Sequence, residues 1–572
     1  MRKLLVYMKG YRTQAILAPL FKLTEVLFEL FVPLVVASII DNGIGENNKG
    51  YVIKGSILMA VLGIVGFICA VIAQYFAAKA AVGFATKLRL ALFEKINSFT
   101  FNNIDKIGTS TLIMRLTGDV NQVQTGVNLT LRLLLRSPFI VFGAMIMAFT
   151  VDSKSALTFA FAILLLSIII VTIMAITIPL HKRVQQKLEV ILLKTREALK
   201  GVRVLRAFCK ENMEIKEFSE TNSNLTISQK FVGKISALMN PLTYVVVNLA
   251  IISIIWIGGK RVYSGNLSSG SIVALYNYMS QILIELVKLA TMIVTLNKSL
   301  ASCSRIEKIM SFDNTTTKTT SKKKRTDNYI EFANVSFKYD DAGESSLNNI
   351  NFTVKKGEHI GIIGPTGSGK STLVNLIPAF YTATDGTIYV DGKDVKSYSE
   401  KKLFKMIGMV FQKSVLFKGS IKENLLLGGK KATNDQLISA LKTAQAFETV
   451  NSKGGLDAKI EQGGKNLSGG QKQRLSIARA LVGNPEILIL DDSASALDFA
   501  TEAALRKALN KLSYKPTIFT VSQRVSSVMH SDKIIVLEDG KIVGIGTHDE
   551  LYKNCELYME ICNTQLNEED LK

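Results

Sequence analysis

The sequence is poor in histidine, proline, tryptophan and cysteine, and acidic residues are fewer than basic ones. Its five cysteines show no C-x-x-C pair and no paired spacing, which is typical of free thiols in a reducing compartment rather than of a disulfide framework. Lys and Arg number 69 against 47 Asp and Glu, a net charge of +22. Basic residues beside membrane helices explain this excess better than nucleic-acid binding, so we expect no nucleic-acid partner.

No stretch is a perfect apolar 20-mer, yet 48% of the residues are apolar and the mean hydropathy is +0.25. The apolar runs are confined to the first 300 or so of the 572 residues, and the remainder reads as an aqueous domain. A chain of this length is too long for one compact domain. We therefore predict an all-α transmembrane domain over 1–312, a linker over 313–327 and an α/β domain over 328–572.

Six segments of the first half are long and apolar enough to span a bilayer. The long connections 81–132 and 181–232 are rich in Lys and Arg, so the positive-inside rule places them and both termini in the cytoplasm. Lys260 and Arg261 fall on the opposite side and fit this topology poorly. The predicted spans are 14–40, 54–80, 133–151, 156–180, 233–258 and 272–298.

The long connections have apolar residues at helical spacing, which predicts extensions of the membrane helices into the cytoplasm. We expect a short cross-helix near 109–116 and another near 201–208. The stretch "DNTTTKTTSKKKRTDN" that follows is polar and without periodicity, as in a solvated linker near a membrane surface.

The second half alternates strand and helix patterns and contains a phosphate-binding signature. "YIEFANVSFKY" and "GTIYVDG" indicate antiparallel strands, whereas "HIGIIG" and "EILILDD" are short apolar runs typical of a buried parallel sheet. "GPTGSGKST" matches G-x-x-x-x-G-K-[ST] between a strand and a helix. Its glycines let backbone N–H groups surround phosphate oxygens, Lys370 reaches the β- and γ-phosphates, and Ser371 offers its hydroxyl to Mg²⁺.

"LSGGQKQRLSIARAL" places a serine and two glycines at a helix N-terminus, where amides and the helix dipole favour an anion. Together with the phosphate loop and the acidic strand end, in that order, this chain resembles the half-transporter exporters of the ATP-binding cassette (ABC) family over nearly its whole length. The resemblance implies two nucleotide domains facing head to tail, so that each signature closes on ATP held by the other. The signature residues are Leu467, Ser468, Gly469, Gly470 and Gln471.

The resemblance also implies roles for single residues, with ATP and Mg²⁺ as cofactors. Tyr339 corresponds to the aromatic residue that stacks on adenine, and Asp498 to the aspartate that couples the two ATP sites. The residues implied at the metal are Ser371, Gln412 and Asp491. The implied ATP-binding residues are Tyr339, Gly364, Thr366, Gly367, Ser368, Gly369, Lys370, Ser371, Thr372 and Gln412.

Two positions depart from the family pattern. Asp492 occupies the place of the catalytic glutamate, and its shorter carboxylate falls ~1 Å or more short of the attacking water, which can cost ~100-fold in rate, about 2.7 kcal/mol. Gln523 occupies the place of the histidine that contacts the γ-phosphate. An amide can hydrogen-bond a phosphate but cannot carry the charge of an imidazolium.

An intact signature beside weakened hydrolytic residues predicts a heterodimer. The partner would be a second, homologous half-transporter that has the glutamate and the histidine; its site would be completed by this chain's LSGGQ, while this chain's own site would turn over slowly. Alternatives are a homodimer with slow hydrolysis and an ATP-gated channel or regulator on the same scaffold. The expected function is ATP-driven export of small amphipathic compounds, drug-like or lipid, across the cytoplasmic membrane, in a protein of bacterial origin.

Ionisable residues in the apolar half are candidates for contacts with cargo, because they usually face a cavity or a partner. Pairing between helices would explain them equally well. The residues that could line a polar-aromatic cavity are Glu25, Glu29, Tyr244, Asn248, Tyr276, Asn277, Gln281 and Glu285.

Overall fold

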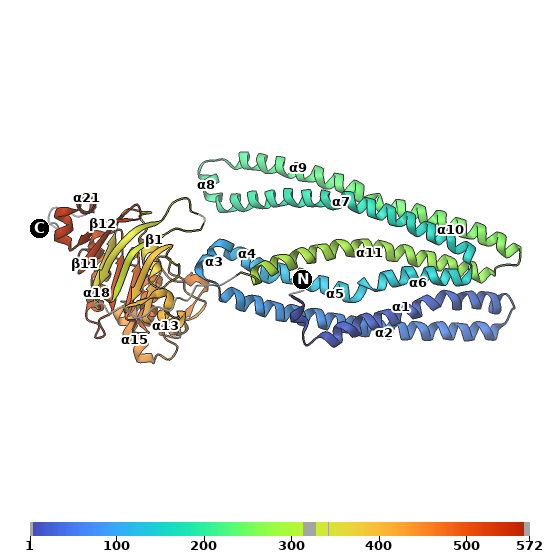
Figure 1. Ribbon diagram of the computed structural model, residues 1–572, viewed down its shortest axis with the longest axis horizontal. Helices are drawn as coiled ribbons and strands as arrows, with labels where there is room; N and C mark the ends of the chain where they lie inside the picture. The colour runs from blue at the N-terminus through green and yellow to red at the C-terminus, as the bar shows by residue number, and fades with distance from the viewer. Residues whose placement is uncertain (1–3, 313–327, 341, 566–572) are drawn as a thin grey trace. The chain divides into compact units, whose positions relative to one another are not determined.

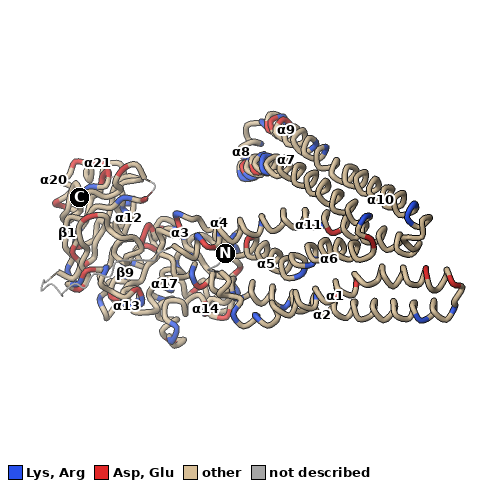
Figure 2. Tube along the Cα trace, turned by 45° about the vertical axis from the view of Figure 1, so that its right-hand side comes forward, with Lys and Arg blue, Asp and Glu red and all other residues tan. Residues whose placement is uncertain are grey.

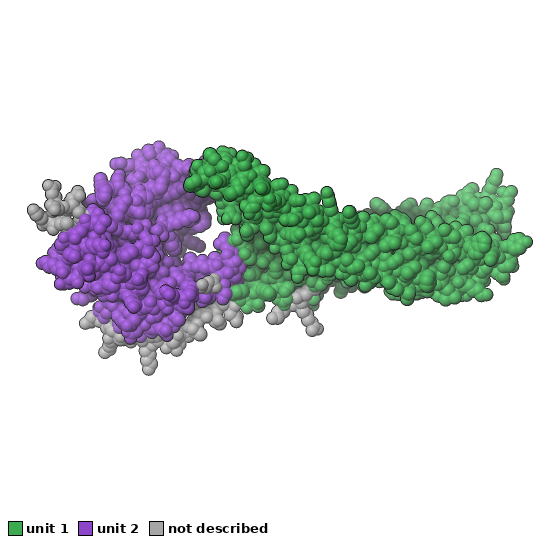
Figure 3. Space-filling view, turned by 90° about the horizontal axis from the view of Figure 1, so that it is seen from above, with its two compact units in different colours: residues 1–97, 110–312 green, residues 98–109, 313–572 purple. Residues whose placement is uncertain are grey.

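The computed structural model describes residues 4–312, 328–340 and 342–565, and the chain divides into two compact units. Unit 1 comprises Met1–Asn97 and Ser110–Phe312, and unit 2 comprises Ser98–Thr109 and Asp313–Lys572 (Figure 3). The linker predicted at 313–327 lies outside the described residues. The two units are therefore described separately.

Unit 1 consists of long helices, and among the described residues six helical segments are long and apolar enough to cross a membrane (Figure 1). These segments are Arg12–Ile44, Lys49–Asn97, Thr109–Val151, Ser153–Lys200, Glu211–Tyr263 and Ser269–Met310. Their elements are η1 (Leu4–Met8), α1 (Arg12–Ser38), η2 (Ile39–Ile44), α2 (Lys49–Asn97), α4 (Thr109–Met114), η3 (Arg115–Asp119), α5 (Val120–Leu129), η4 (Thr130–Leu134), α6 (Arg136–Val151), α7 (Ser153–Lys200), α8 (Val202–Ala207), α9 (Glu211–Ala237), α10 (Met239–Tyr263) and α11 (Ser269–Met310).

The helices are longer than a bilayer requires, as the sequence predicted. Helix α2 has 49 residues, which at 1.5 Å per residue is ~74 Å against a hydrocarbon core of ~30 Å. Figure 2 shows charged residues gathered where α7, α8 and α9 meet, with long uncharged stretches along the helices. The uncharged stretches match the apolar interior of a membrane, and the charged ends match water.

Small buried residues bring the membrane helices close together. Ala144, Ala148, Ala156 and Ala274 are fully buried in the core of unit 1, and small side chains let helix backbones approach in lipid. Tyr278 is also fully buried, and its hydroxyl donates to the Leu30 carbonyl over 2.7 Å. This bond satisfies a polar group that the hydrocarbon would leave unpaired.

Lys260 and Arg261, the two basic residues that fit the topology poorly, each contact a nearby side chain. The Arg261 guanidinium lies 2.5 Å from the Asp152 carboxylate, which also caps α7 by accepting from the Ser155 amide. The Lys260 ammonium lies 5.1 Å from the ring centre of Trp256, an exposed residue. These contacts give both charges a local partner.

Unit 2 contains two main sheets, one antiparallel and one mostly parallel, and the sequence predicted strands of both types. In one, β1 (Ile330–Phe337) pairs antiparallel with both β2 (Leu347–Val354) and β4 (Asp385–Val390), and β5 (Lys393–Asp394) follows at the edge. The other runs β12-β11-β3-β10-β9-β6. Its strands are β3 (His359–Ile363), β6 (Ile407–Val410), β9 (Ile487–Asp491), β10 (Thr517–Val521), β11 (Lys533–Glu538) and β12 (Lys541–Gly546).

Strands β3, β9 and β10 run parallel in this sheet and β9 and β10 are buried throughout, as expected for strands with both faces covered. A small sheet pairs β7 (Gly419–Ser420) with β8 (Lys459–Ile460). The helices of unit 2 are α3 (Phe101–Ile107), α12 (Lys370–Leu376), η5 (Val395–Ser397), α13 (Glu400–Met406), α14 (Ile421–Leu426), α15 (Asn434–Thr443), α16 (Phe447–Ser452), η6 (Gln462–Gly464), α17 (Gly469–Leu481), α18 (Phe499–Asn510), α19 (Val525–Val528), α20 (His548–Asn554) and α21 (Glu556–Gln565).

A buried carboxylate fastens the third apolar segment to the sixth. Asp119 in η3 is 5% exposed; it accepts from Arg115 over 2.7 Å and from two nitrogens of Arg305 in α11. Ser302 accepts a further bond from Arg305. Removing one member of a buried charge cluster leaves the others without compensation.

We expect Asp119→Ala to lower the free energy of unfolding by about 2–3 kcal/mol, because it leaves two guanidinium groups facing each other. The midpoint of thermal unfolding of the purified full-length chain measures the effect. Thr117→Ala is the matched control, since Thr117 is exposed in the same turn and bonds only to its own helix at Ile113. Equal midpoints for the two variants would contradict the expectation.

Candidate functional site

The phosphate loop lies between β3 and α12, in the order that the motif requires. Gly364, Gly367 and Gly369 have φ values of +152°, +88° and +95°, which side-chain-bearing residues rarely adopt. A Cβ at Gly364 would lie 2.0 Å from the Leu537 carbonyl oxygen, and one at Gly369 2.8 Å from that of Ser346. Backbone conformation therefore favours glycine at all three positions, and space also requires it at Gly364 and Gly369.

The two side chains predicted to contact the phosphates and the metal, Lys370 and Ser371, lie at the start of α12. The Lys370 ammonium donates to the carbonyls of Gly364 (2.8 Å) and Pro365 (2.6 Å), inside the loop. Burial lowers the pKa of Lys370, while the nearby Asp492 and Asp491 carboxylates oppose this shift. The Ser371 hydroxyl donates to the Asp491 carboxylate over 2.8 Å. Two oxygen ligands thus converge, which fits Mg²⁺, a cation that prefers oxygen.

A cavity of about 780 Å³ opens over this loop. Its volume suits a nucleotide, since small-molecule sites measure ~300–1,000 Å³. It also receives residues that the sequence did not single out, from the loop before β2 (Ser345, Ser346) and from the β11–β12 turn (Asp539, Gly540). The D-G pair marks that turn in the sequence, but nothing there shows that it reaches the cavity. The predicted residues that line it are Thr366, Gly367, Gly369, Lys370, Ser371, Thr372, Gln412, Asp491, Asp492 and Gln523.

Asp492 follows directly after β9 and has a φ of +46°. Its amide donates to the Val521 carbonyl over 2.9 Å, which ties the turn to β10. Its carboxylate accepts from the Gln412 amide over 3.3 Å. The short carboxylate is thus held beside a residue expected at the metal.

Gln523 lies at the turn between β10 and α19, and it is exposed where it lines the cavity. The amide of the preceding Ser522 donates to the Ile362 carbonyl over 3.1 Å, which fixes the turn to β3. The neighbouring Arg524 donates to the Ser495 carbonyl over 3.3 Å and lies 5.6 Å from the Phe499 ring centre. Gln523 is thus anchored through its neighbours in the backbone.

The signature residues begin α17 and are not part of the cavity lining. Ser468 caps the helix by accepting from the Gln471 amide, while the Gln471 side chain accepts from the Ser468 amide. This reciprocal cap leaves an exposed, ordered helix N-terminus, the arrangement that favours an anion. The structure therefore places LSGGQ apart from this chain's own phosphate loop.

Asp498 also lies outside the cavity lining, as the N-cap of α18. Its carboxylate accepts from the Thr501 amide over 2.7 Å. The Thr501 side chain and this amide together lower the pKa of Asp498. A Cβ on Gly470 would lie 2.9 Å from the Ala496 carbonyl, so the signature packs closely on the turn that ends at Asp498. Gln473, not singled out from the sequence, bonds both the Asp492 carbonyl (3.1 Å) and the Ala496 amide (3.3 Å).

Tyr339 lies outside the cavity lining but beside it. Its hydroxyl is 3.2 Å from the Thr372 hydroxyl, and its ring meets that of Tyr381 edge-on at 5.2 Å between centres. The Tyr381 hydroxyl donates to Asp105 in α3 over 2.6 Å. Tyr339, the residue implied at adenine, is therefore linked through Tyr381 to α3, a short helix that belongs to unit 2.

Helix α3 differs from the sequence expectation, which placed the first cross-helix near 109–116. Residues 109–116 instead start the third apolar segment, Thr109–Val151. The separate helix runs from Phe101 to Ile107, because Thr100 caps its start and Gly108 at φ +79° ends it. The Phe101 ring packs on Phe380 with 4.3 Å between ring centres.

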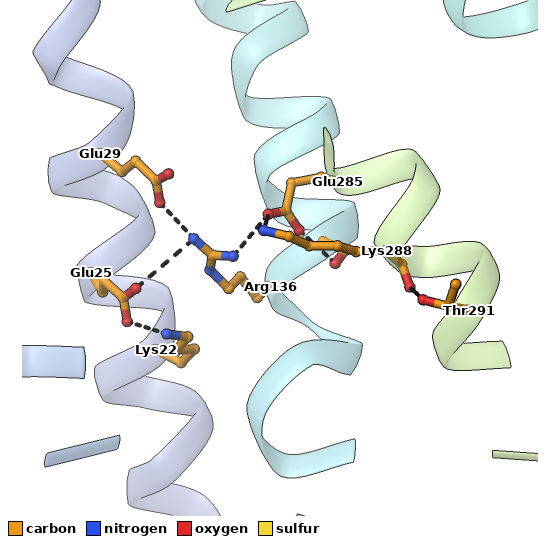
Figure 4. Close-up of polar contacts among 8 residues, drawn as sticks. Lys22, Glu25, Glu29, Arg136, Glu285, Lys288 and Thr291 are labelled. Atoms are coloured by element: carbon orange, nitrogen blue, oxygen red, sulfur yellow. Dashed lines mark hydrogen bonds and ion pairs between the residues drawn. The ribbon is translucent and has the colours of Figure 1, made fainter. Parts of the chain in front are cut away.

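A second polar cluster lies among α1, α6 and α11 (Figure 4). Arg136, at the start of α6, forms ion pairs with Glu285 (2.8 Å) and Glu29 (2.9 Å) and lies 3.9 Å from Glu25. Glu285, whose side chain is 4% exposed, also accepts from Ser137 and Lys288. The acidic residues singled out from the sequence are therefore brought together, but around an arginine that sequence reasoning missed.

The members of this cluster differ in exposure. Glu25 is paired with Lys22 over 2.5 Å and is 14% exposed, whereas the Glu29 side chain is 37% exposed. Arg136 and its neighbour Arg132, a turn apart in an otherwise apolar run, are the signal that could have identified the centre. Among the other singled-out residues, Tyr244, Asn248 and Tyr276 are exposed and Asn277 and Gln281 half-buried.

Comparison with known proteins agrees with both units. The pattern of the ABC transporter transmembrane region matches residues 15–286, and that of the ABC transporter matches residues 347–495. The ABC transporter ATP-binding protein YfiB of Bacillus subtilis, itself uncharacterized, is 35% identical over 100% of this chain and 99% of its own. YgaD of the same organism, provisionally named a multidrug export ATP-binding/permease protein, is 31% identical over 96% and 97%.

A solved structure has the same fold. A bacterial Atm1-family ABC exporter with ATP bound superposes with a TM-score of 0.82 at 22% identity, covering 98% of this chain and 99% of the other. The two matched patterns, the full-length relatives and this fold agree with the site geometry. The chain is a member of the ABC transporter family: a multi-pass membrane protein in which an exporter-type transmembrane domain is joined to an ATP-binding domain.

Proposed function

We propose that this chain is one half of a heterodimeric exporter that moves small amphipathic compounds by alternating access. The observation that carries the proposal is an ordered signature outside the chain's own nucleotide cavity, beside weakened hydrolytic residues within it. Ser468 and Gln471 hold the signature ready for an anion, while Asp492 and Gln523 face the cavity. The chain would thus be better suited to completing the ATP site of a partner than to hydrolysing ATP at its own site.

ATP would bind in the cavity over the phosphate loop, with Mg²⁺ between Ser371, Gln412 and Asp491. Two nucleotides would join the domains head to tail, because each lies between one loop and the opposite signature. ATP would bind the closed pair better than the open one, and this difference shifts the population from inward-open to outward-open. Hydrolysis at the partner's site would reset the pair.

Short helices would carry this change to the membrane helices. Helix α3 is suited to the task, because Asp105 bonds Tyr381 and Asp340 lies within reach of both Asn102 (3.2 Å) and Lys106 (3.5 Å). We assign the second such role to α8, Val202–Ala207, whose Val204 is 59% exposed. Exposed apolar side chains on a short helix favour docking to another subunit.

The heterodimer is favoured over a slow homodimer because two substitutions weaken the same site. Asp492 and Gln523 both line the cavity, and each removes a part of hydrolysis that the other cannot replace. Purification of this chain with an affinity tag tests the assembly, since a second half-transporter should accompany it in equal amount. Recovery of the tagged chain alone, with full exporter ATPase rates, would refute the proposal.

The cargo is proposed to be a small amphipathic compound, with a cationic group recognised by Glu29. The side chain of Glu29 is the most exposed of the three clustered glutamates, and exposed aromatic and amide groups lie on α10 and α11 at Tyr244, Asn248 and Tyr276. The multidrug-export name of YgaD supports this class of cargo. ATP-dependent accumulation in sealed inverted vesicles distinguishes export from the alternative, a nucleotide-gated passive channel.

We expect Asp492→Glu to raise ATP turnover of the full-length chain by about 10- to 100-fold, because the added methylene restores the reach of the carboxylate. Steady-state phosphate release measures it. Asp435→Glu is the matched control, since Asp435 is exposed in the first turn of α15, is not part of the cavity lining and should leave turnover unchanged. A wild-type rate that already equals that of Asp492→Glu would count against a degenerate site.

We expect Glu29→Gln to lower ATP-dependent uptake of a cationic amphipathic dye into inverted vesicles by about fivefold or more, because one exposed carboxylate is lost. Glu25→Gln, one turn away and engaged by Lys22, should have a smaller effect. Equal losses in the two variants, or a loss that extends to neutral dyes, would argue for a structural role of the ion pairs.

A further inference from the structure

The last described residue of α21, Gln565, bonds the turn that carries Gln523. Its side-chain nitrogen donates to the Gln523 carbonyl over 2.8 Å, and its side-chain oxygen accepts from the Val525 amide over 2.9 Å. One amide group therefore makes two hydrogen bonds, one on either side of Arg524. Both lengths lie within the ordinary range for such bonds.

The Val525 amide needs such a partner. Val525 begins α19, a helix of four residues, and the N-cap residue Arg524 provides no side-chain bond. First-turn amides have no acceptor within their own helix, and a buried one without a partner is costly. Val525 is fully buried. Gln565 thus supplies from another helix the acceptor that a Ser or Asp cap would supply locally.

Helix α21, which carries the Gln565 side-chain amide, is packed firmly into the core of unit 2. Its Tyr558 and Cys562 are fully buried in a cluster with Ile363, at the end of β3, and with Val525 and Val528. The Tyr558 hydroxyl also lies 2.8 Å from the imidazole of His548 in α20. The position of Gln565 is therefore fixed by the same core that supports the phosphate-loop strand.

We propose that Gln565 is a positioning residue of this chain's nucleotide site. It holds the backbone on both sides of Arg524, so that the side-chain amide of Gln523 faces the γ-phosphate. The proposal rests on the role assigned to Gln523 above. It makes the C-terminal helix part of the ATP site, although Gln565 does not line the cavity. With the two bonds lost, the turn can rotate and the Gln523 side chain leaves the cavity for part of the time.

Nucleotide retention at this chain's own site tests the proposal. The full-length chain, purified with the subunits that accompany it, is loaded with Mg²⁺ and 8-azido-ATP, chased with ATP and photolabelled, and the label is read on this chain's band. We expect Gln565→Ala to shorten retention by about fivefold, a change equal to about one hydrogen bond. Asn563→Ala, on the same helix, removes a side chain that accepts from the Tyr552 hydroxyl, and it should retain nucleotide as the wild type does.

A conservative variant separates the two bonds. Gln565→Glu keeps an acceptor for the Val525 amide but faces the Gln523 carbonyl with a carboxylate, so it should preserve slow hydrogen exchange at Val525 and still shorten retention. Gln565→Ala should speed that exchange by about tenfold, because it leaves the buried Val525 amide without its acceptor. A general loss of stability alone would change all these readouts together.

The double variant decides whether Gln565 acts through Gln523. In a Gln523→Ala background, Gln565→Ala should shorten retention no further, because the side chain that it positions is gone. Full additivity, or wild-type retention in Gln565→Ala alone, would overturn the proposal. If Gln523→Ala leaves retention unchanged, the role of Gln523 is wrong and the proposal fails with it; if only Gln565→Ala has no effect, the role of Gln523 stands.

Discussion

Hydrocarbon offers no hydrogen-bond partner to a peptide group, and this constraint determines the whole apolar half of the chain. The backbone there can only be helical, since a helix satisfies its own amides and carbonyls. The same helices continue beyond the bilayer, as the 49 residues of α2 require. Because a helix is stiff along its length, a displacement at its aqueous end moves the part inside the membrane as well. Among the described residues, π-helical turns interrupt the regular α-helix at η2, in the first segment, and at η3 and η4, in the third.

The ion cluster around Arg136 follows from the same constraint. Three glutamates face Arg136, Lys22 and Lys288, so the charges balance within the cluster. A lone carboxylate such as Glu285 would be costly in an apolar surrounding, but with three polar partners it is compensated. Ion pairs of this kind add little net stability, yet removing one partner is strongly unfavourable. They therefore fix how α1, α6 and α11 meet more than how firmly they are held.

Local order in the sequence was enough to predict the fold class, and most of the residues predicted at the ATP site line one cavity. The phosphate loop, the acidic end of β9 and the capped start of α17 are each contiguous, and their residues carry the backbone conformations that they need. The bonds missed are those between distant residues: Arg136 with Glu285, Tyr381 with Asp105, and Gln565 with Gln523. No periodicity relates such positions, because only the packed structure brings them together. Helix α3 was not predicted for a different reason, since Thr100 and Gly108 were not recognised as its cap and its end.

The φ of +46° at Asp492 has a consequence of another kind. Left-handed backbone is unfavourable for most residues with a side chain, and aspartate is among the few that enter it readily. A glutamate at this position would adopt the same left-handed backbone at a higher conformational cost. The residue that shortens the carboxylate therefore also lowers the conformational cost of this turn, and both effects come from one missing methylene.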